Sequence, residues 1–328
     1  MRFDTNWIKA VIQATRDLTP GIREFTLAPE GGATPYPTGS HLSVRVLIYG
    51  RPDLRHYSLI GEPREGCWRI AVKREDPGRG GSRYMWSLPL GARLELAPPD
   101  SHFELSRDAP EYLLVAGGIG VTPLCGMAAA LARRKAAFRM LYAGRSRSRM
   151  AYVDELAAEL GPRLEIIADD EQRTIDFAAE FDRLHPEAET YVCGPIGLLE
   201  AARQAWMQTG RRPELMIFET FGSSGRYAAE PFLVRVPRMG LEVEVAQNTT
   251  MLDALEAAGI GVLADCRRGE CGLCMLDVVA VEGKIDHRDV FLSPRQHAEN
   301  RKICSCVSRA VGGAITIDPP WRGDPVLK

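Results

Sequence analysis

The first hundred residues alternate short apolar runs with turn residues, and no long segment repeats apolar positions with a helical period. The apolar runs have the length of single strands and lie at 22–27, 42–48, 68–72 and 93–96. Short strands separated by frequent turns are typical of all-β domains. This section therefore predicts a small antiparallel barrel or sandwich.

From about residue 110 the chain alternates apolar strands with segments of helical periodicity. Strands are predicted at 112–116, 139–143, 163–168, 190–193 and 214–218. Helices are predicted at 122–134, 150–160 and 196–207. Alternation of this kind predicts a parallel, doubly wound α/β sheet.

The last hundred residues follow a polar, glycine-rich segment at 221–231 that is typical of a linker. They begin with two predicted strands, 232–236 and 241–245. A helix should follow, with Thr249 or Thr250 as its N-cap and Gly259 as its stop.

Composition agrees with two or three folded domains in 328 residues, since 45% of the residues are hydrophobic and 26% are charged. A net charge of −2 gives no general attraction to nucleic acid or to a membrane. The uncharged stretch 112–132 is long enough to span a bilayer, but its glycines and a Thr-Pro pair interrupt it. With no signal-peptide pattern at the start, we expect a cytoplasmic monomer without a membrane segment.

Five of the eight cysteines lie between residues 266 and 306, and Cys266, Cys271 and Cys274 have the spacing C-x4-C-x2-C. This is the plant-type [2Fe–2S] spacing, whose fourth thiolate lies further downstream, here at Cys304 or Cys306. Neighbouring glycines, Gly269 and Gly272, would let backbone N–H groups point at the sulfurs. The spacing fits a zinc site poorly, and disulfides are rare in the cytosol. The six histidines are scattered and have no metal-site or catalytic-triad spacing.

Two glycine-bearing turns follow strands of the predicted parallel sheet. Gly118 and Gly120 belong to a turn before Thr122-Pro123, and Cys193-Gly194-Pro195 ends a later strand. Ligands of doubly wound sheets bind beyond the carboxyl ends of strands, so these turns favour a dinucleotide, although tight packing alone explains glycines equally well. Arg145 and Ser146 could contact its ribose and phosphates, or form a solvated turn.

A second set of candidates lies in the first section. Arg55-His56-Tyr57-Ser58 combines a phosphate-binding cation, an aromatic ring and a hydroxyl, and Gly80-Gly81-Ser82 follows Val72-Lys73 as a possible phosphate cradle. Composition alone favours an ordinary strand and turn, so the inference depends on the whole set of motifs.

In this order, RHYS, GRGGS, GGIGVTP, CGP and C-x4-C-x2-C resemble the ferredoxin–NADP reductase superfamily fused to a plant-type ferredoxin. A C-terminal iron–sulfur domain is similar to the phthalate dioxygenase reductase family, over essentially the whole chain. The resemblance implies an FMN-binding antiparallel β-barrel at 1–106, an NAD-binding α/β domain at 107–224 and a β-grasp [2Fe–2S] domain at 225–328.

The resemblance also implies roles for single residues. The flavin-binding residues would be Arg55, His56, Tyr57, Ser58, Val72, Lys73, Gly80, Gly81, Ser82, Thr122, Glu219 and Phe221. From their positions at the strand ends, the NAD-binding residues would be Gly118, Gly120, Arg145, Ser146, Asp169, Cys193, Gly194 and Pro195, although a packing role explains Cys193 equally well. Of these, Ser58, Thr122 and Cys193 would lie near the site of hydride transfer. The fourth cluster ligand would be Cys306, which stands directly before V-S-R, leaving Cys304 as an extra buried thiol.

The function implied is electron transfer from NADH through FMN and the [2Fe–2S] cluster to a Rieske-type oxygenase. No acid or base is needed, because hydride passes directly between nicotinamide and flavin. The alternatives are a reductase for a cytochrome P450 or diiron oxygenase, and a redox carrier without enzyme activity. Asp169 and Asp170 favour NADH over NADPH, whereas Arg145, Arg147 and Arg149 could bind a 2′-phosphate. We expect Arg267 and Arg268 at the surface that docks the oxygenase.

Overall fold

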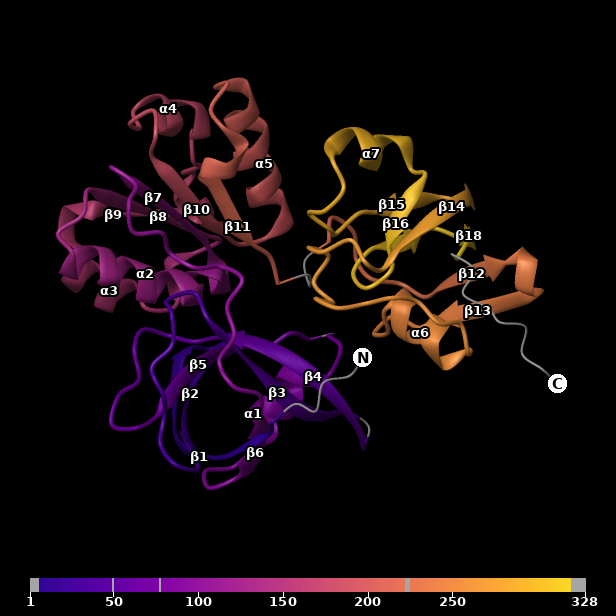
Figure 1. Ribbon diagram of the computed structural model, residues 1–328, viewed down its shortest axis with the longest axis horizontal. Helices are drawn as coiled ribbons and strands as arrows, with labels where there is room; N and C mark the ends of the chain where they lie inside the picture. Colours follow the sequence, from indigo (N-terminus) through magenta and orange to yellow (C-terminus); the bar gives the residue numbers. More distant parts are fainter. Residues whose placement is uncertain (1–5, 49, 77, 222–224, 320–328) are drawn as a thin grey trace. The chain divides into compact units, whose positions relative to one another are not determined.

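The computed structural model describes residues 6–48, 50–76, 78–221 and 225–319, and the chain forms two compact units that divide after Glu219. The first unit contains an antiparallel and a parallel sheet, and the second contains a mixed sheet (Figure 1). The predicted boundary between residues 224 and 225 borders residues 222–224, which lie outside the described segments, and it stays a prediction. No described helix is both long and apolar enough to cross a membrane.

The antiparallel sheet at the start of the chain is a closed barrel, which decides between the two predicted shapes. Its strands are β1 (Ile8–Thr19), β2 (Ile22–Pro29), β3 (His41–Ile48), β4 (Arg51–Ser58), β5 (Trp68–Lys73) and β6 (Arg93–Leu96), in the order β4-β3-β6-β1-β2-β5. A bridge between Leu59 and Ile70 joins the two ends of this order, and the Ile60 N–H donates to Arg69 O at 2.9 Å. Closure removes the exposed edges of the sheet.

Helix α1 (Gly81–Ser87) lies against the barrel and was not expected from the sequence. Its seven residues are too few to show a helical period. Met85 is fully buried in the barrel core, and the Trp86 indole donates to the Val72 carbonyl at 3.0 Å. Gly80 is the N-cap of α1, so the helix begins within the glycine turn predicted as a phosphate cradle.

The parallel sheet confirms the predicted α/β section. Its strands are β7 (Tyr112–Gly117), β8 (Phe138–Gly144), β9 (Leu164–Ala168), β10 (Glu189–Cys193) and β11 (Met216–Glu219), in the order β11-β10-β7-β8-β9. Helices α2 (Val121–Arg133) and α3 (Val153–Leu160) cover one face, and α4 (Phe177–Asp182) and α5 (Ile196–Gln208) cover the other (Figure 1). Of these four helices, the sequence did not predict α4, which has six residues. The strand order reverses between β7 and β10, where ligands of such sheets bind.

The second unit has a β-grasp arrangement, with a helix lying across a mixed sheet. The sheet contains β12 (Phe232–Val236), β13 (Leu241–Val245), β14 (Met275–Val281), β16 (Lys302–Cys304) and β18 (Ala314–Asp318), in the order β13-β12-β18-β14-β16. Strands β15 (Lys284–Asp286) and β17 (Arg309–Val311) pair separately, and the helices are α6 (Met251–Ala257) and α7 (Pro294–Glu299). Thr250 is the N-cap of α6, because its hydroxyl oxygen accepts from the Asp253 N–H at 3.0 Å.

Within the first unit, a buried carboxylate connects the barrel to the parallel-sheet region. Glu24 of β2 accepts a hydrogen bond from the Tyr152 hydroxyl at 2.7 Å and pairs with Arg69 at 3.4 Å and Arg16 at 3.6 Å. A cavity of about 490 Å³ lies beside it, and its lining includes Cys125 of α2. None of the predicted flavin or nucleotide residues lines this cavity.

This contact leads to a prediction about stability. Glu24→Ala should lower the free energy of unfolding of the first unit by about 2–3 kcal/mol, because the partly buried Arg69 and the buried Tyr152 hydroxyl lose their shared acceptor. Glu155→Ala is the control, since Glu155 pairs with Arg16 at 2.8 Å but is half exposed, and such pairs contribute about 0–1 kcal/mol. Urea unfolding followed by circular dichroism measures both, and equal effects would contradict the role given to Glu24.

Candidate functional site

The loop that carries the first three cysteines folds around the sulfur of Cys266. The backbone N–H groups of Arg268, Glu270 and Cys271 each donate to Cys266 Sγ at 3.4 Å. Such inward curvature requires positive φ angles, which are 50° at Arg267 and 78° at Gly269. Donors aimed at sulfur stabilise a thiolate and set the potential of a bound cluster, so this loop fits an iron–sulfur centre.

Close packing behind the loop explains its two glycines as well. A Cβ on Gly269 would lie 2.6 Å from a Val307 methyl group, and one on Gly272 would lie 2.3 Å from the Phe291 ring. Both glycines also have positive φ, so any other residue would be strained there. The sequence predicted glycines for N–H orientation, but it gave no indication of Phe291 and Val307 behind them.

Cys274 of this loop and two further cysteines, Cys304 and Cys306, are buried in one apolar cluster with Leu252 and Leu292. Hydrogen bonds from Cys304 and Cys306 lower the pKa of the Cys274 thiol, whereas burial raises the pKa of Cys266. Several buried thiols cannot all ionise unless positive charge lies among them, and bound iron supplies that charge. The donor set therefore fits a [2Fe–2S] cluster.

The two candidates for the fourth ligand differ in their neighbours. The sulfur of Cys306 accepts from the Gly269 N–H and interacts with Cys266 as well as Cys274. The sulfur of Cys304 interacts with Cys274, Cys306 and Asp289. Cys306 is therefore the one that accepts from the loop backbone and interacts electrostatically with Cys266 and Cys274, and Cys304 is fully buried.

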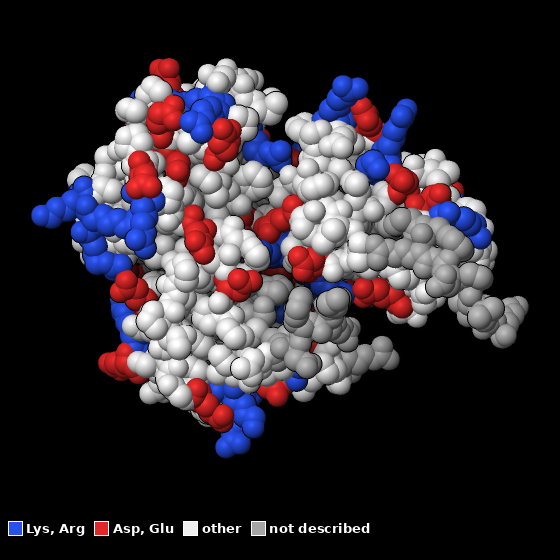
Figure 2. Space-filling view, in the orientation of Figure 1, with Lys and Arg blue, Asp and Glu red and all other residues white. Residues whose placement is uncertain are grey.

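Neither arginine of the cysteine loop presents an unpaired charge for docking. Arg267 pairs with Asp253 at 2.6 Å and with Glu256 at 2.9 Å. Arg268 is 7% exposed and pairs with Glu270 at 3.1 Å. On the face of the molecule in Figure 2, acidic and basic side chains are interspersed. The expectation that Arg268 lies at the surface is therefore wrong, because its guanidinium is buried against a carboxylate of its own loop.

In the barrel, the two predicted flavin motifs lie against each other. A Cβ on Gly81 would be 2.5 Å from Arg55 Nε, so the arginine side chain crosses directly over this glycine. Arg55 is held by Asp53 at 2.7 Å and by the Leu54 carbonyl at 2.6 Å. Ser82 Oγ accepts from the Glu75 N–H at 3.1 Å. The structure thus brings together segments 55–58 and 80–82, which are far apart in sequence.

The remaining barrel candidates differ in exposure. Ser58 is buried, and its hydroxyl has no hydrogen-bond partner among the described residues, so it fits a heteroatom of a bound ring. Burial raises the pKa of the half-buried Tyr57 phenol. His56 is exposed beside Ser43, with 2.9 Å between Nδ1 and Oγ. The Val72 side chain lies in the barrel core, whereas that of Lys73 is exposed.

The two glycine turns of the parallel sheet meet at the reversal between β7 and β10. A Cβ on Gly120 would lie 2.2 Å from the Cys193 carbonyl oxygen, and one on Gly194 would lie 2.9 Å from Gly117 Cα. Gly118 has a φ of 54° and no atom within 4 Å of a Cβ, so open space lies beside it. Packing therefore explains Gly120 and Gly194, while Gly118 remains available to a ligand.

Three predicted residues share the carboxyl edge of this sheet. Cys193 is paired in register with Ala116 on one side and with Glu219 on the other, and both Cys193 and Glu219 are buried. Thr122 is buried at the start of α2, where its hydroxyl donates to the Ile119 carbonyl at 2.9 Å. Pro195 precedes α5 as its N-cap, and Phe221, half-buried, is the last residue described before the gap at 222–224.

The polar candidates for the nucleotide follow β8 and β9. Arg145 and Asp169 are both exposed, and the Asp170 N–H donates to the Arg145 carbonyl at 3.1 Å, which joins the two loops. Ser146 lies 3.3 Å from Ser148, hydroxyl to hydroxyl. Arg147, a candidate for binding a 2′-phosphate, is instead paired with Glu171 at 2.5 Å.

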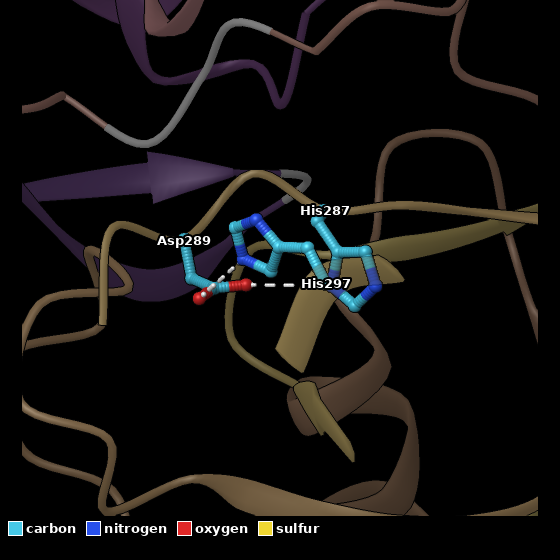
Figure 3. Close-up of side chains that lie close together, drawn as sticks. All are labelled: His287, Asp289 and His297. Atoms are coloured by element: carbon cyan, nitrogen blue, oxygen red, sulfur yellow. Dashed lines mark hydrogen bonds and ion pairs between the residues drawn. The ribbon is translucent and has the colours of Figure 1, made fainter. Parts of the chain in front are cut away.

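One cluster was missed entirely, since two of the scattered histidines meet in the structure. His287 and His297 stack with their ring centroids 4.3 Å apart, and both lie beside the buried Asp289 (Figure 3). The sequence showed no metal-site spacing among the histidines, and these two come together only because the chain between them turns back into α7. Their ten-residue separation gave no signal in the sequence.

Comparison with known proteins places these sites in context. The family model for a 2Fe-2S iron-sulfur cluster binding domain matches residues 234–311, and that for an oxidoreductase NAD-binding domain matches residues 114–204. The chain is 38% identical over 310 residues to the heme-dependent oxidative N-demethylase beta subunit of Ectopseudomonas mendocina (strain ymp), covering 94% of this chain and 97% of the relative.

Two further similar proteins are phthalate dioxygenase reductases. The phthalate dioxygenase reductase of Burkholderia cepacia is 33% identical over 326 residues, covering 96% of this chain and 98% of the relative. A solved phthalate dioxygenase reductase, described as a modular structure for electron transfer from pyridine nucleotides to [2Fe-2S], matches with a TM-score of 0.73 at 31% identity. That match covers 95% of this chain and 98% of the solved one.

The contact between the two glycine turns can be tested by substitution. Gly120→Ala should separate the turns, lower the free energy of unfolding by about 1–3 kcal/mol through overpacking, and raise the KM for NADH about tenfold. Gly197→Ala in α5 is the control, because nothing lies within 4 Å of its added Cβ. Unfolding and NADH kinetics measure both variants, and identical behaviour would contradict the role of Gly120.

Proposed function

Because the chain belongs to the phthalate dioxygenase reductase family, we propose that it is the reductase component of a two-component Rieske-type oxygenase. It is an NADH-dependent flavin and iron–sulfur oxidoreductase, and family membership supports the cofactor set of FMN, a [2Fe–2S] cluster and NADH. Its relatives include reductase subunits of oxygenase systems, which supports an oxygenase as its partner. We also propose that this oxygenase is of the Rieske type and that the chain is a monomer.

The observation that carries this proposal is the cysteine loop, in which three backbone N–H groups surround one sulfur. A flavin supplies the conversion of a two-electron hydride into single electrons, which an iron–sulfur cluster then passes on. For the flavin we propose Arg55 and Gly81 at its phosphate and the buried Ser58 hydroxyl at its ring. For the nicotinamide we propose the crevice at Thr122 and Cys193.

The outlet for electrons is proposed at the rim of the cysteine loop. Leu273, between two cluster cysteines in sequence, is 48% exposed, and Phe291 behind Gly272 is 45% exposed. Because the loop arginines are paired within the unit, docking should depend on this apolar rim and on local polar contacts more than on long-range attraction.

A second candidate function is the delivery of electrons to a haem-dependent oxygenase. The relative that is 38% identical is named a heme-dependent oxidative N-demethylase beta subunit. The same electron-transfer chemistry serves either acceptor, since both take electrons one at a time. The choice between them depends on the partner and not on the flavin or nucleotide site.

Reconstitution with separate acceptors tests the proposed function. The NADH-reduced protein should show the rhombic electron paramagnetic resonance spectrum of a reduced [2Fe–2S] cluster. It should release FMN on denaturation and sustain turnover of a Rieske oxygenase. Ferricyanide serves as the control acceptor, because a small oxidant takes electrons directly from the flavin. Turnover of a haem-dependent oxygenase without turnover of a Rieske oxygenase would favour the second candidate. Release of FAD alone would contradict the FMN assignment.

The fourth cluster ligand is proposed to be Cys306, and paired substitutions test it. Cys306→Ser should lose most of its iron and acid-labile sulfide, because the cluster loses a thiolate that accepts from the loop backbone. Cys304→Ser is the matched control, since it removes a neighbouring buried thiol, and it should retain two irons per chain. Iron and sulfide analysis together with the reduced spectrum decide, and the reverse pattern would assign Cys304.

A further inference from the structure

His287, Asp289 and His297 form a compact cluster in the second unit (Figure 3). His287 and Asp289 follow strand β15, and His297 lies on α7. Asp289 is 1% exposed, and its carboxylate lies 3.1 Å from His297 Nε2 and 3.7 Å from His287 Nδ1. Two imidazoles therefore face one buried carboxylate.

The hydrogen bonds of His287 leave one of its nitrogens unsatisfied. Its Nε2 lies 3.1 Å from Asn300 Oδ1, and the Asn300 Nδ2 group donates to the Ala298 carbonyl, so Nε2 carries the proton and donates. The Nδ1 atom then has a lone pair. It is buried without a hydrogen-bond partner, and 3.7 Å to Asp289 is too long for a hydrogen bond.

The carboxylate of Asp289 is held in place as an anion. It accepts from the Leu292 N–H at 2.9 Å and from the Ser308 hydroxyl at 3.1 Å. Burial alone would raise the pKa of this carboxyl, but the His297 imidazole and the Leu292 N–H lower it. A lone pair and a negative oxygen thus face each other inside the protein, an arrangement that a cation between them would stabilise.

We propose that His287 Nδ1, Asp289 and His297 Nε2 bind one divalent metal ion such as zinc. Ligands at 2.0–2.1 Å from a tetrahedral ion lie about 3.3 Å apart. Here the three ligand atoms lie within 4.8 Å of one another, with 3.1 Å from His297 Nε2 to Oδ2 and 3.7 Å from His287 Nδ1 to Oδ1 of Asp289, so small side-chain movements would bring them to one ion. Imidazole and carboxylate are ligands that suit zinc. A water molecule completes the fourth position.

The surrounding residues supply the outer contacts that metal ligands usually have. Asn300 accepts the second ring proton of His287 and so fixes its tautomer, and Ser308 and Leu292 orient the carboxylate. The ion would connect the segment after β15 to α7. The next residues, Val290 and Phe291, donate their N–H groups to the Gly269 carbonyl at 3.0 and 3.2 Å. An ion bound at Asp289 would therefore stabilise the segment that contacts the cysteine loop.

Equilibrium dialysis of the full-length, iron-loaded protein against zinc tests the proposal, with zinc and iron measured by mass spectrometry. We expect one zinc per chain with iron unchanged at two. His297→Gln should weaken zinc binding at least tenfold, because it removes a ligand on the partly exposed side of the site. Asn300→Ala keeps all three ligands and should weaken it about 10–100-fold by releasing the His287 tautomer.

His102→Gln is the matched control, because His102 forms an exposed pair with Asp100 at 3.4 Å and reports zinc held by any surface histidine and carboxylate. It should bind zinc as the unaltered chain does. Equal zinc affinity in the unaltered chain and in His297→Gln would overturn the proposal, as would zinc uptake that displaces iron or that disappears in His102→Gln. NADH-to-ferricyanide turnover should stay unchanged in His297→Gln, which separates loss of this site from failure of the flavin function.

Discussion

Sulfur atoms that must become anionic inside a protein govern the structure of the C-terminal unit. Three N–H groups reach Cys266 only because the backbone takes left-handed conformations at Arg267 and Gly269. The tight loop then leaves no room for side chains on its inner face, so Val307 and Phe291 pack directly on its glycines. Iron ligation, glycine placement and the residues behind the loop all follow from the need to stabilise charge on sulfur where water is scarce.

The sequence predicted best what depends on local repetition. Strands such as β7 are continuous apolar runs, helices α2 and α5 are thirteen residues each, and the C-x4-C-x2-C spacing is a direct consequence of cluster geometry. Short elements and long-range contacts were beyond it. Helix α1 has no measurable period, and the bridge between Leu59 and Ile70 that closes the barrel joins segments that no pattern connects. His287 and His297 meet only because the chain turns back through α7.

The glycine turns of the parallel sheet illustrate why sequence alone left two explanations open. Gly120 is required because the Cys193 carbonyl occupies the space of a Cβ, which is a packing requirement. Gly118, two residues earlier, faces open space in a left-handed conformation, as a residue close to a ligand would. The structure shows the packing requirement at Gly120, and the open space beside Gly118 is where the proposed nucleotide would bind.

The parallel pairing of β12 with β18 has a consequence for synthesis of the protein. Strand β12 opens the C-terminal unit, yet its parallel partner β18 is the last strand among the described residues and occupies the middle of the sheet. On the ribosome, the flavin and nucleotide unit is complete and able to fold while this central strand has not yet emerged. Because such distant strands must meet before the sheet exists, assembly of this unit is a late and slow event. Until strand β18 pairs, the cysteines of this unit are free thiols, which are open to oxidation.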